Sequence, residues 1–366
     1  MKFAILREVF LQPLSQVIGV VERRQTLPVL ANFLLVARDG RLSVTGTDME
    51  VELVSSVAAD IAQEGEITIP ARKLVDIVKA LSDGAKITLS VKDEKATLTA
   101  GRSRFTLSTL PAAEFPANDH VEAVDQVALK EKDLKRLLDK TSFAMANQDV
   151  RYYLNGLLLD FRAGKLRTVA TDGHRLAVCD LDAPAEMKGD RQLIVPRKGV
   201  LELARMLNDS DDEATLSLGR NHVRLAKDGT QFTSKLIDGR FPDYEAVIPA
   251  GADKQLIMDR QVFTHALQRA AILSNEKYRG VRLEASGNSL KIIAHNPQHE
   301  EAVEEIEVEL NFDSIAVGFN VTYLLDALMA LESESVSMEL RDPNSSCLVS
   351  ARESDLNRHV VMPLKL

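Results

Sequence analysis

The chain has 366 residues, and its 45% hydrophobic content is enough for two or three globular domains with packed cores. It has no Trp and only 5% aromatic residues, so stacking on single-stranded bases is not expected to be its main binding device. A net charge of −9 argues against nonspecific nucleic-acid binding by the whole surface.

The N-terminal stretch MKFAILREVFLQPL carries charges and has no long apolar run, so it predicts neither a signal peptide nor a membrane span. Cys179 and Cys347 are far apart and lack metal-ligand spacing, which is typical of reduced thiols in a cytoplasmic protein. The seven His residues are scattered without ligand spacing. We therefore expect no metal and no cofactor.

Each third of the chain is expected to open with a short strand and a helix. Apolar residues recur at helical spacing in Val9–Val21, Leu134–Met145 and Phe263–Ala270. Pro13 suits the first of these helices only if it lies in the first turn. Three β-rich runs then follow within each of Val29–Leu53, Tyr152–Val178 and Tyr278–Val303.

A second strand and helix follow the three strands in every third, in the segments Gly65–Leu81, Arg191–Leu207 and Asp313–Leu331. Pro70 and Pro196 stand at the strand-to-helix joint of the first two segments, and Gly318 is expected to take that place in the third. Further strands close each third. Hairpins rather than crossover helices join most strands, which predicts an α+β fold with mainly antiparallel sheets.

The turns Thr47-Asp48, Thr171-Asp172 and His295-Asn296 hold equivalent places, and successive turns are 124 residues apart. A repeat of this length is a whole domain and not a solenoid unit. The sequence therefore predicts three tandem copies of one domain, each a duplicated strand-helix-three-strand unit. We expect the domains to span residues 1–122, 125–250 and 252–366.

The six predicted helical segments carry a charge of +7 together, which leaves −16 for the rest of the chain. A positive layer of helices in a negative protein indicates a surface that faces phosphate. For any single helix, a solvated cationic face is the simpler interpretation, but five of the six helices share the bias. Because no base-reading motif accompanies them, we expect backbone contact without sequence preference.

The two ends of the repeat array carry opposite charges. Lys95, Arg102 and Arg104 lie in the last strands of the first third, whereas six Glu residues lie within 300–309 of the last third. Opposite signs at opposite ends favour head-to-tail association of chains, which closes into a ring or continues as a filament. The alternative is that each run is a solvated strand face or a charged edge that blocks aggregation.

Thr171–His174 is the one arrangement that resembles a catalytic pair, with Asp172 and His174 as base and orienter. Asp-Gly is, however, a common hairpin turn, and the two equivalent turns lack the pair. Nucleophile-elbow, phosphate-loop, dinucleotide and metalloprotease motifs do not occur in the sequence. We therefore expect no catalysis, and a hydrolase using Asp172 and His174 remains the alternative.

Several stretches carry a resemblance to a known family: QDVRYYLNGLLLD, TVATDGHRLAVCDL, IVPRKGVLELARML, SKLIDGRFPDY, AILSNEKYRGVRL and the terminal VVMPLKL. Together with TLPVLANFLL and PARKL, they resemble the bacterial sliding clamps, the β subunits of DNA polymerase III, of the gammaproteobacterial type. The resemblance covers the whole chain. It implies a homodimeric ring with helices inside and sheets outside, which encircles double-stranded DNA and makes the replicative polymerase processive.

The resemblance also implies a partner site and a set of contact residues. In the family, an apolar cleft between the second and third domains binds short linear motifs of polymerases, the clamp loader and repair proteins. The matching cleft residues are Leu154, Thr171, Gly173, His174, Arg175, Leu176, Pro242, Val247, Ser346, Val360, Val361, Met362, Pro363, Leu364 and Leu366. The matching DNA contacts are Arg24, Arg72, Gln148, Tyr152, Tyr153, Arg197, Lys198, Tyr278 and Arg279. The matching dimer contacts are Arg102, Arg104, Phe105, Leu107, Ile272, Leu273, Glu300, Glu301 and Glu304.

Two places depart from the family pattern. Glu245-Ala246 stands where Arg is common, so a contact with an acidic part of a partner peptide is expected to be lost. Arg358 and His359 stand where small residues are usual, so the cleft rim is expected to be more basic there. A second function stays open, that of an acidic peptide-binding scaffold that does not encircle DNA.

Overall fold

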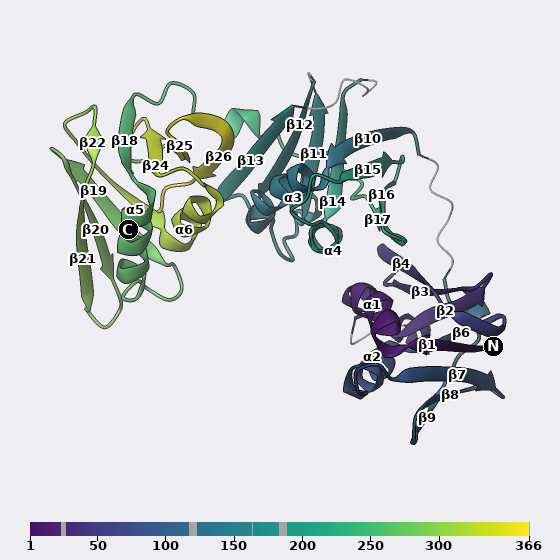
Figure 1. Cartoon of the computed structure of the whole chain (residues 1–366). Helices are drawn as coiled ribbons and strands as arrows, with labels where there is room; N and C mark the ends of the chain where they lie inside the picture. Colours follow the sequence, from purple (N-terminus) through teal and green to yellow (C-terminus); the bar gives the residue numbers. More distant parts are fainter. Residues whose placement is uncertain (23–26, 117–122, 163, 183–188, 366) are drawn as a thin grey trace. The chain divides into compact units, whose positions relative to one another are not determined.

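The computed structural model describes residues 1–22, 27–116, 123–162, 164–182 and 189–365, except for the side chain of Asp355. Figure 1 shows its six α-helices and its twisted sheets. The described residues form two compact units, each taken by itself below. Unit 1 comprises Met1–Lys132 and Leu201–Leu236, and unit 2 comprises Asp133–Val200 and Ile237–Leu366. Across the described ranges, no helix is long and apolar enough to cross a membrane.

Unit 1 contains a five-stranded and an eight-stranded sheet. The first has the order β5-β1-β7-β8-β9, with β1 (Lys2–Leu6), β5 (Asp60–Gln63), β7 (Lys86–Lys92), β8 (Lys95–Ala100) and β9 (Ser103–Ser108). The second has the order β10-β15-β16-β17-β4-β3-β2-β6, with β2 (Asn32–Arg38), β3 (Arg41–Thr47), β4 (Val51–Ala58), β6 (Gly65–Pro70), β10 (Asp125–Lys130), β15 (Glu213–Leu218), β16 (His222–Lys227) and β17 (Thr230–Lys235). Helices α1 (Arg7–Val17) and α2 (Ala71–Ala80) pack against each other.

Unit 2 contains a nine-stranded and a four-stranded sheet. The order β14-β11-β12-β13-β26-β25-β24-β18-β22 joins β11 (Gly156–Arg162), β12 (Lys165–Thr171), β13 (Arg175–Asp182), β14 (Arg191–Pro196), β18 (Lys254–Asp259), β22 (Glu309–Leu310), β24 (Ser335–Leu340), β25 (Cys347–Ala351) and β26 (Ser354–Val361). The order β21-β20-β19-β23 joins β19 (Gly280–Ser286), β20 (Ser289–His295), β21 (Glu301–Glu307) and β23 (Ser314–Asn320).

Helices α5 (Arg260–Ala271) and α6 (Val321–Ala330) pack together in unit 2, and α5 also covers β20 and β21. The remaining helices, α3 (Glu131–Asp139) and α4 (Arg197–Met206), each contain residues of both units. All strand pairs described are antiparallel, as the hairpin connections predict. The α+β class with antiparallel sheets is thereby confirmed.

Two local expectations were wrong. Helix α1 begins at Arg7, so Pro13 lies inside the helix and not in its first turn. The proline ring removes one backbone hydrogen bond there, but its side chain is buried in the core, which offsets part of that cost. The residue at the third strand-to-helix joint is Asn320 and not Gly318, because Asn320 precedes α6 and its side chain accepts a hydrogen bond from Thr322 N at 2.9 Å.

The three equivalent turns are built by the same device. Asp48 Oδ1 accepts hydrogen bonds from the backbone N–H groups of Glu50 and Val51, and Asp172 Oδ1 does so from His174 and Arg175. Asn296 Oδ1 accepts from Gln298 and Glu300, so the third turn is one residue longer. Val51, Arg175 and Glu300 therefore hold equivalent places at the start of the strand that follows each turn.

The repeats are joined edge to edge through equivalent strands. β17, the last strand of the second repeat, pairs with β4 of the first, and β26 of the third repeat pairs with β13 of the second. The strand equivalent to β17 and β26 in the first repeat is β9, and the strand equivalent to β4 and β13 in the third repeat is β21. Both β9 and β21 are edge strands of their sheets. Among the described residues, one strand of each kind therefore keeps a free edge.

Candidate functional site

Some of the residues predicted to line the partner cleft, Leu176, Val360 and Val247, meet on one face of the nine-stranded sheet in unit 2. Leu176 in β13 lies directly opposite Val360 in β26, and both are buried in one apolar cluster. Phe241 and Tyr244 belong to the same cluster, and Val247 packs against it. Because Leu176 and Val360 come from different repeats, the apolar floor of this face depends on the pairing of β13 with β26. We call this face, with the segments on either side of it, the candidate peptide surface.

The chain terminus runs along this surface after β26 ends. Met362 N donates to His174 O at 3.0 Å, and Leu364 N donates to Gly318 O at 2.7 Å. Equivalent bonds exist in the other repeats, where Lys235 N donates to Glu50 O and Ile237 N to Ile194 O. Met362, Pro363 and Leu364 are half-buried, whereas Val361 is buried in the core of the third repeat. Leu366 lies outside the described residues.

The turn from Thr171 to Leu176 is structural and not catalytic in its geometry. Thr171 Oγ1 donates to Arg175 O at 2.5 Å, and Gly173 takes the left-handed backbone conformation with a φ of 87°. A Cβ on Gly173 would lie 2.9 Å from the Arg151 guanidinium, which gives a second reason for glycine. Asp172 Oδ1 binds backbone N–H groups and Oδ2 binds Arg175 Nε at 3.1 Å, so its oxygens cap the turn rather than orient the exposed His174 ring.

Arg175 ties the candidate peptide surface to the third repeat. Its guanidinium pairs with Asp326 of α6, donates to Phe143 O at 2.8 Å, and lies 4.6 Å from the centre of the Tyr323 ring. Such a cation in contact with two aromatic faces and two carboxylates is well held. We therefore place Arg175 in the structural support of the surface.

The other predicted members lie around this floor. Leu154 is buried at the end of a short 3₁₀ helix (Tyr152–Leu154), and Ser346 is half-buried just before β25. Pro242 is exposed, and Val247 ends a 3₁₀ helix (Glu245–Val247) that follows it. Tyr244 Oη donates to the buried Asp160 Oδ2 at 2.6 Å. The pKa of Tyr244 is raised, mainly because the hydroxyl is buried and secondly because it donates this hydrogen bond.

A row of alternating charges borders this floor, and the sequence interpretation missed it. Asp160 lies directly opposite Arg167, and Arg167 lies opposite Asp180 on the neighbouring strands β11, β12 and β13. Arg358 of β26 extends the row, with its Nη2 3.0 Å from Asp180 Oδ2. Each strand contributes one of these charges, which is visible in the sequence, but the register that brings them together is not. Arg358 is therefore partnered, and the expected basic rim is neutralised at this point.

His359 stands where the other two repeats have phenylalanine. It follows Arg358 in β26, it is 1% exposed, and both ring nitrogens lack a hydrogen-bond partner among the described residues. The equivalent residues are Phe232 in β17 and Phe105 in β9. Burial lowers the pKa of His359 to about 3, and the charges of Lys140 and Arg175 lower it further. The ring is therefore neutral in the folded chain at neutral pH.

We expect His359→Phe to make the chain more resistant to acid. A histidine whose folded pKa is depressed adds stability above its unfolded pKa, and this is lost as the pH falls below it. The wild type should therefore lose about 1.4 kcal/mol per pH unit at this position below roughly pH 6.5, and the variant should not. Urea unfolding of both chains at pH 7.0 and pH 4.5 measures the difference. A gap between the two chains that does not change with pH would contradict the assignment.

The predicted DNA contacts lie mostly in unit 2. Gln148 has a positive φ of 58°, and Tyr152, 57% exposed, stands edge-on to Tyr153 in the same loop. Arg197 Nη1 donates to Met145 O at 3.2 Å at the base of this loop, and Lys198 follows it in α4. Tyr278 is exposed beside Lys277, and Arg279 is next to it with a positive φ. Arg72 belongs to unit 1, where it donates to Val21 O, and Arg24 lies outside the described residues.

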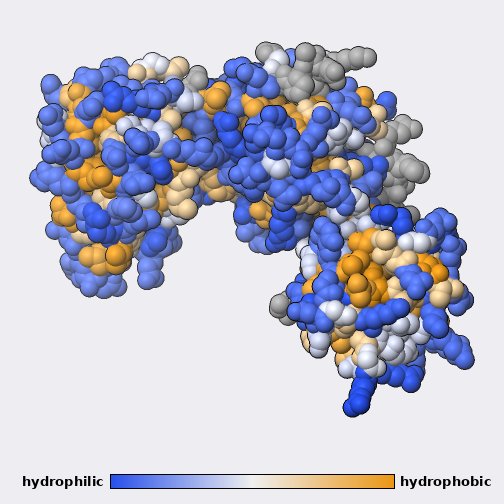
Figure 2. Space-filling model, viewed as in Figure 1, coloured by the Kyte–Doolittle hydropathy of each residue, from blue (hydrophilic) through white to orange (hydrophobic). Residues whose placement is uncertain are grey.

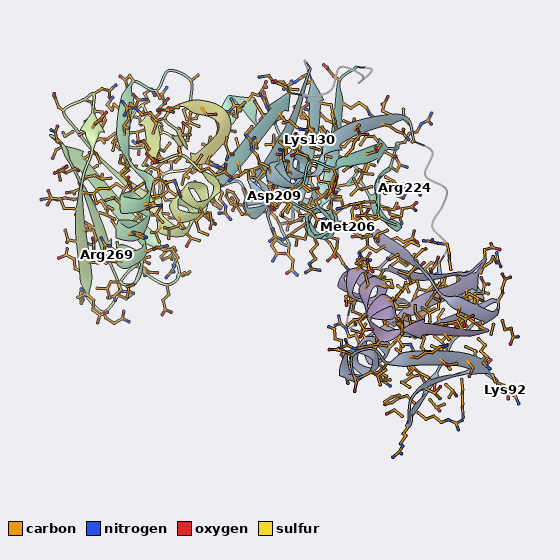
Figure 3. All side chains as sticks on the ribbon, in the orientation of Figure 1. Lys92, Lys130, Met206, Asp209, Arg224 and Arg269 are labelled. Atoms are coloured by element: carbon orange, nitrogen blue, oxygen red, sulfur yellow. The ribbon has the colours of Figure 1, made fainter. Side chains whose placement is uncertain are left out.

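The predicted dimer contacts lie in two places, one at β9 and the other at β21 and the end of α5. Arg102 precedes β9, and Arg104, Phe105 and Leu107 lie in it, with Phe105 and Leu107 half-buried. Ile272, 77% exposed, and Leu273 follow α5, close in sequence to Arg269, which Figure 3 labels. Arg269 Nη2 binds Glu304 Oε2 at 2.5 Å, and this hydrogen bond lowers the pKa of Glu304. Glu300 and Glu301 are exposed at the start of β21.

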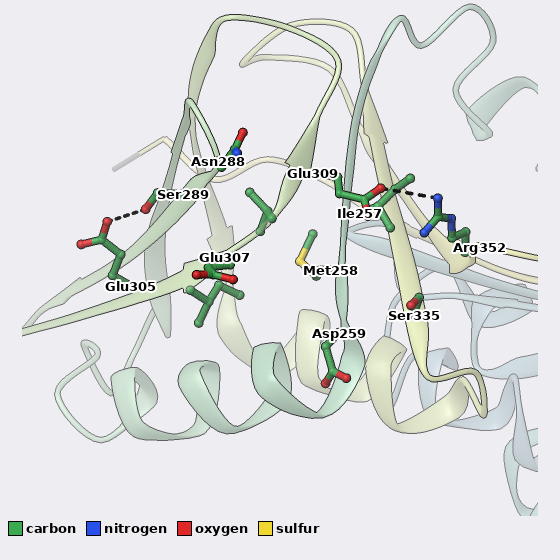
Figure 4. A pocket seen from close by; sticks show the side chains of 12 residues that line it. Ile257, Met258, Asp259, Asn288, Ser289, Glu305, Glu307, Glu309, Ser335 and Arg352 are labelled. Carbon is green, nitrogen blue, oxygen red and sulfur yellow. Dashed lines mark hydrogen bonds and ion pairs between the residues drawn. The ribbon is translucent and has the colours of Figure 1, made fainter.

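A cavity with a polar lining lies elsewhere in the third repeat. About 740 Å³ opens where the chain passes from β21 to β22, and Figure 4 shows Glu305, Glu307, Glu309 and Arg352 around it. Arg352 Nη2 lies 3.4 Å from Glu309 Oε2 across this space. An acidic, polar lining does not suit an apolar peptide. The apolar cluster, and not this polar cavity, therefore marks the candidate peptide surface.

Three family models match successive parts of the chain. They describe the N-terminal, central and C-terminal domains of the DNA polymerase III beta subunit and match residues 1–119, 128–243 and 245–365. The beta sliding clamps of Pseudomonas aeruginosa and Escherichia coli K12 are 54% and 48% identical to this chain, and each alignment covers the full length of both proteins.

Solved structures agree with these sequence matches. A crystal structure of the P. aeruginosa subunit matches the whole chain with a TM-score of 0.96, and one of the same protein bound to griselimycin matches with 0.95. The Caulobacter crescentus subunit, 39% identical, also matches over its full length with 0.95. These relatives are named as clamps and as a polymerase subunit, which agrees with the turn geometry at Asp172 and assigns the chain a non-catalytic role. The chain therefore belongs to the DNA polymerase III beta subunit family, and its function is that of a sliding clamp.

Proposed function

We propose that two copies of this chain close head to tail into a ring around double-stranded DNA, with β9 of each copy paired to β21 of the other. The observation that carries this proposal is the pair of unpaired edges, since the equivalent strands at both other junctions are paired. Head-to-tail contacts pair every β9 and every β21 only if the chains close into a ring. Two chains of three repeats give a ring of six repeats. We keep the domain bounds 1–122, 125–250 and 252–366 for these repeats.

The register of this contact follows from the other two junctions. Ser234 lies opposite Val51, and Val361 lies opposite Arg175. Leu107 is the equivalent of Ser234 and Val361. The three residues lie opposite equivalent positions of the preceding strand, which are Ala96, Val223 and Cys347. Glu300 is the equivalent of Val51 and Arg175. Leu107 is therefore expected opposite Glu300 of the second copy.

The faces of the two strands agree with this register. Counting back along β9 places Phe105 opposite Ala302, and both side chains are half-buried on the helix-covered face of their own sheets. On the other face, Arg104 lies opposite the exposed Val303, with Glu301 and Glu305 as its diagonal neighbours. A shift by one residue would place Phe105 on the wrong face. Glu304 faces Arg269 of its own chain and is the least available of the predicted acidic partners.

A cysteine pair tests this register. In the variant Arg104→Cys with Val303→Cys, mild oxidation is expected to join two chains, because directly opposite residues bring their Cβ atoms close enough for a disulfide. Cys179 and Cys347 are buried, and burial raises the pKa of both thiols, so they do not interfere. Arg104→Cys with Ala302→Cys points the two thiols to opposite faces and is the control. Equal cross-linking of both pairs on a denaturing gel would contradict the register.

The ring explains how the chain binds DNA without a strong or specific contact. Topology keeps a ring on DNA, so weak phosphate contacts from the cationic helices, with Arg72, Arg197 and Lys198 among them, suffice and permit sliding. The candidate peptide surface then recruits polymerases, the clamp loader and other proteins that carry a clamp-binding motif. An apolar floor with Met362 at its edge suits peptides of varied sequence. We place this activity in the cytoplasm.

Retention on DNA of two shapes tests the encirclement. Protein loaded by a clamp loader onto a nicked circular plasmid is expected to remain with the DNA through gel filtration. Cutting the plasmid once should release it, because a ring slides off a free end. Equal retention on circular and linear DNA would overturn the proposal and favour an acidic peptide-binding scaffold.

A further inference from the structure

Glu245 lies at the edge of the candidate peptide surface, and its carboxylate is paired with two arginines of the same chain. Its Oε1 accepts hydrogen bonds from Arg162 Nη2 at 2.8 Å and from Arg167 Nη1 at 3.0 Å. Both arginines also donate to Tyr244 Oη at 3.2 Å. When two guanidinium groups share a carboxylate, their positive charges offset its negative charge, so it exerts only a weak electrostatic force on a bound peptide. Glu245 therefore does not act as a free negative charge on the rim.

The two arginines are anchored on the sheet below. Arg167 binds Asp180 through Nε at 2.6 Å and Nη2 at 2.9 Å, a two-pronged contact that fixes its fork. This contact also raises the pKa of Arg167, so the charge is permanent. Arg162 lies 3.4 Å from the buried Asp160. Exposed ion pairs contribute little when both side chains must be ordered, but here the arginine partner is already fixed.

The segment that Glu245 holds is the wall of the candidate peptide surface. Tyr244–Ile248, which we call the wall segment, packs Tyr244, Val247 and Ile248 against the apolar cluster that contains Leu176 and Val360. Tyr244 and Glu245, at its start, also border a cavity of about 530 Å³, which Asp160, Arg162 and Pro242 line as well. Apolar packing therefore does not enclose the start of the wall segment on the side of this cavity. The ion pair of Glu245 with Arg162 lies on that side.

The row of charges continues past the wall segment into the third repeat. Asp180 binds Arg167 and also Arg358, which lies in β26 two residues before Val360. The wall segment and β26, which precedes Met362, are thus connected by Glu245, Arg167, Asp180 and Arg358 in turn. A shift at either end of this network changes the distance between the two sides of the surface.

We propose that Glu245 is a positioning residue, which holds the wall segment at the distance that a partner peptide requires and contributes no charge of its own to peptide selection. The inference rests on the proposed peptide binding at this surface. It predicts that reversing the charge of Glu245 affects all partner peptides alike, whereas a free rim charge would favour one peptide charge over the other.

Two synthetic peptides distinguish a positioning role from a free rim charge. Both have the same apolar core, and one carries two Lys residues beside it whereas the other carries two Asp residues. Glu245→Lys repels Arg162 and Arg167 and is expected to weaken both peptides by a similar factor of about ten, as a displaced wall loosens the site. Glu245→Gln keeps an acceptor oxygen and should bind both peptides like the wild type. Asp243→Lys, the same charge change at an exposed neighbour, is the control. Opposite shifts of the two peptides with Glu245→Lys, or no shift, would overturn the inference.

Hydrogen exchange gives a readout that needs no peptide. The backbone N–H groups of Val247 and Ile248 donate to Tyr244 O and Glu245 O, and they should exchange faster in Glu245→Lys than in the wild type or in Asp243→Lys. Unchanged exchange would refute the role of Glu245 itself. If the wild type binds neither peptide while the exchange difference is present, the peptide surface is wrong and the wall contact stands.

Discussion

Replacing Phe105 and Leu107 with aspartate is expected to leave the chain monomeric. Both side chains lie on the half-buried face of the edge strand β9, where the proposed pairing covers them with Ala302 and the exposed Ile272 of the second copy. Two carboxylates there would be buried beside Glu300 and Glu304 without a partner, and an unpaired buried charge costs several kcal/mol. Light scattering after size exclusion measures the mass, with the wild type as a dimer.

The matched control exchanges two exposed apolar residues away from the strand edges. Leu201 on α4 is 45% exposed and Val262 on α5 is 50% exposed. Leu201→Asp with Val262→Asp changes charge and hydrophobicity equally and should remain a dimer. A Phe105 and Leu107 variant that stays dimeric with an unchanged circular dichroism spectrum would exclude β9 from ring closure. The monomer should also be lost from nicked circular DNA, since an open chain cannot encircle it.

Deleting residues 362–366 is expected to abolish peptide binding and leave the dimer intact. The deletion removes Met362 from the surface together with the hydrogen bonds that Met362 N and Leu364 N make to His174 O and Gly318 O. The unpaired edges β9 and β21 are not touched. Calorimetry with the synthetic peptides that carry the apolar core should show an affinity loss of at least about a hundredfold, as expected when central contacts are removed.

Lys365→Ala is the control for this deletion, because Lys365 is exposed, is not a predicted cleft residue, and its replacement keeps both backbone hydrogen bonds. That variant should bind the peptides within a few-fold of the wild type. If the chain without residues 362–366 still binds these peptides, the terminal segment does not belong to the binding surface. If it becomes monomeric, the effect on binding is not local.

The local pattern of this sequence determined its elements and its repeat. Apolar spacing gave the helices, turn residues gave the hairpins, and the 124-residue period gave three copies, because each of these signals depends only on neighbours along the chain. The exceptions are local competitions that a pattern does not settle. Pro13 is accommodated inside α1 because its side chain is buried, and Asn320 rather than Gly318 precedes α6.

Only the tertiary structure decided which strands meet and which charges face each other. Asp160, Arg167, Asp180 and Arg358 come from four strands up to 198 residues apart, and a one-residue slip in any pair would turn a charge to the other face. Likewise, the pairing of β17 with β4 and of β26 with β13 identified β9 and β21 as the unpaired edges. A sequence records which residues are available, but contacts between distant strands depend on a register that only the folded chain defines.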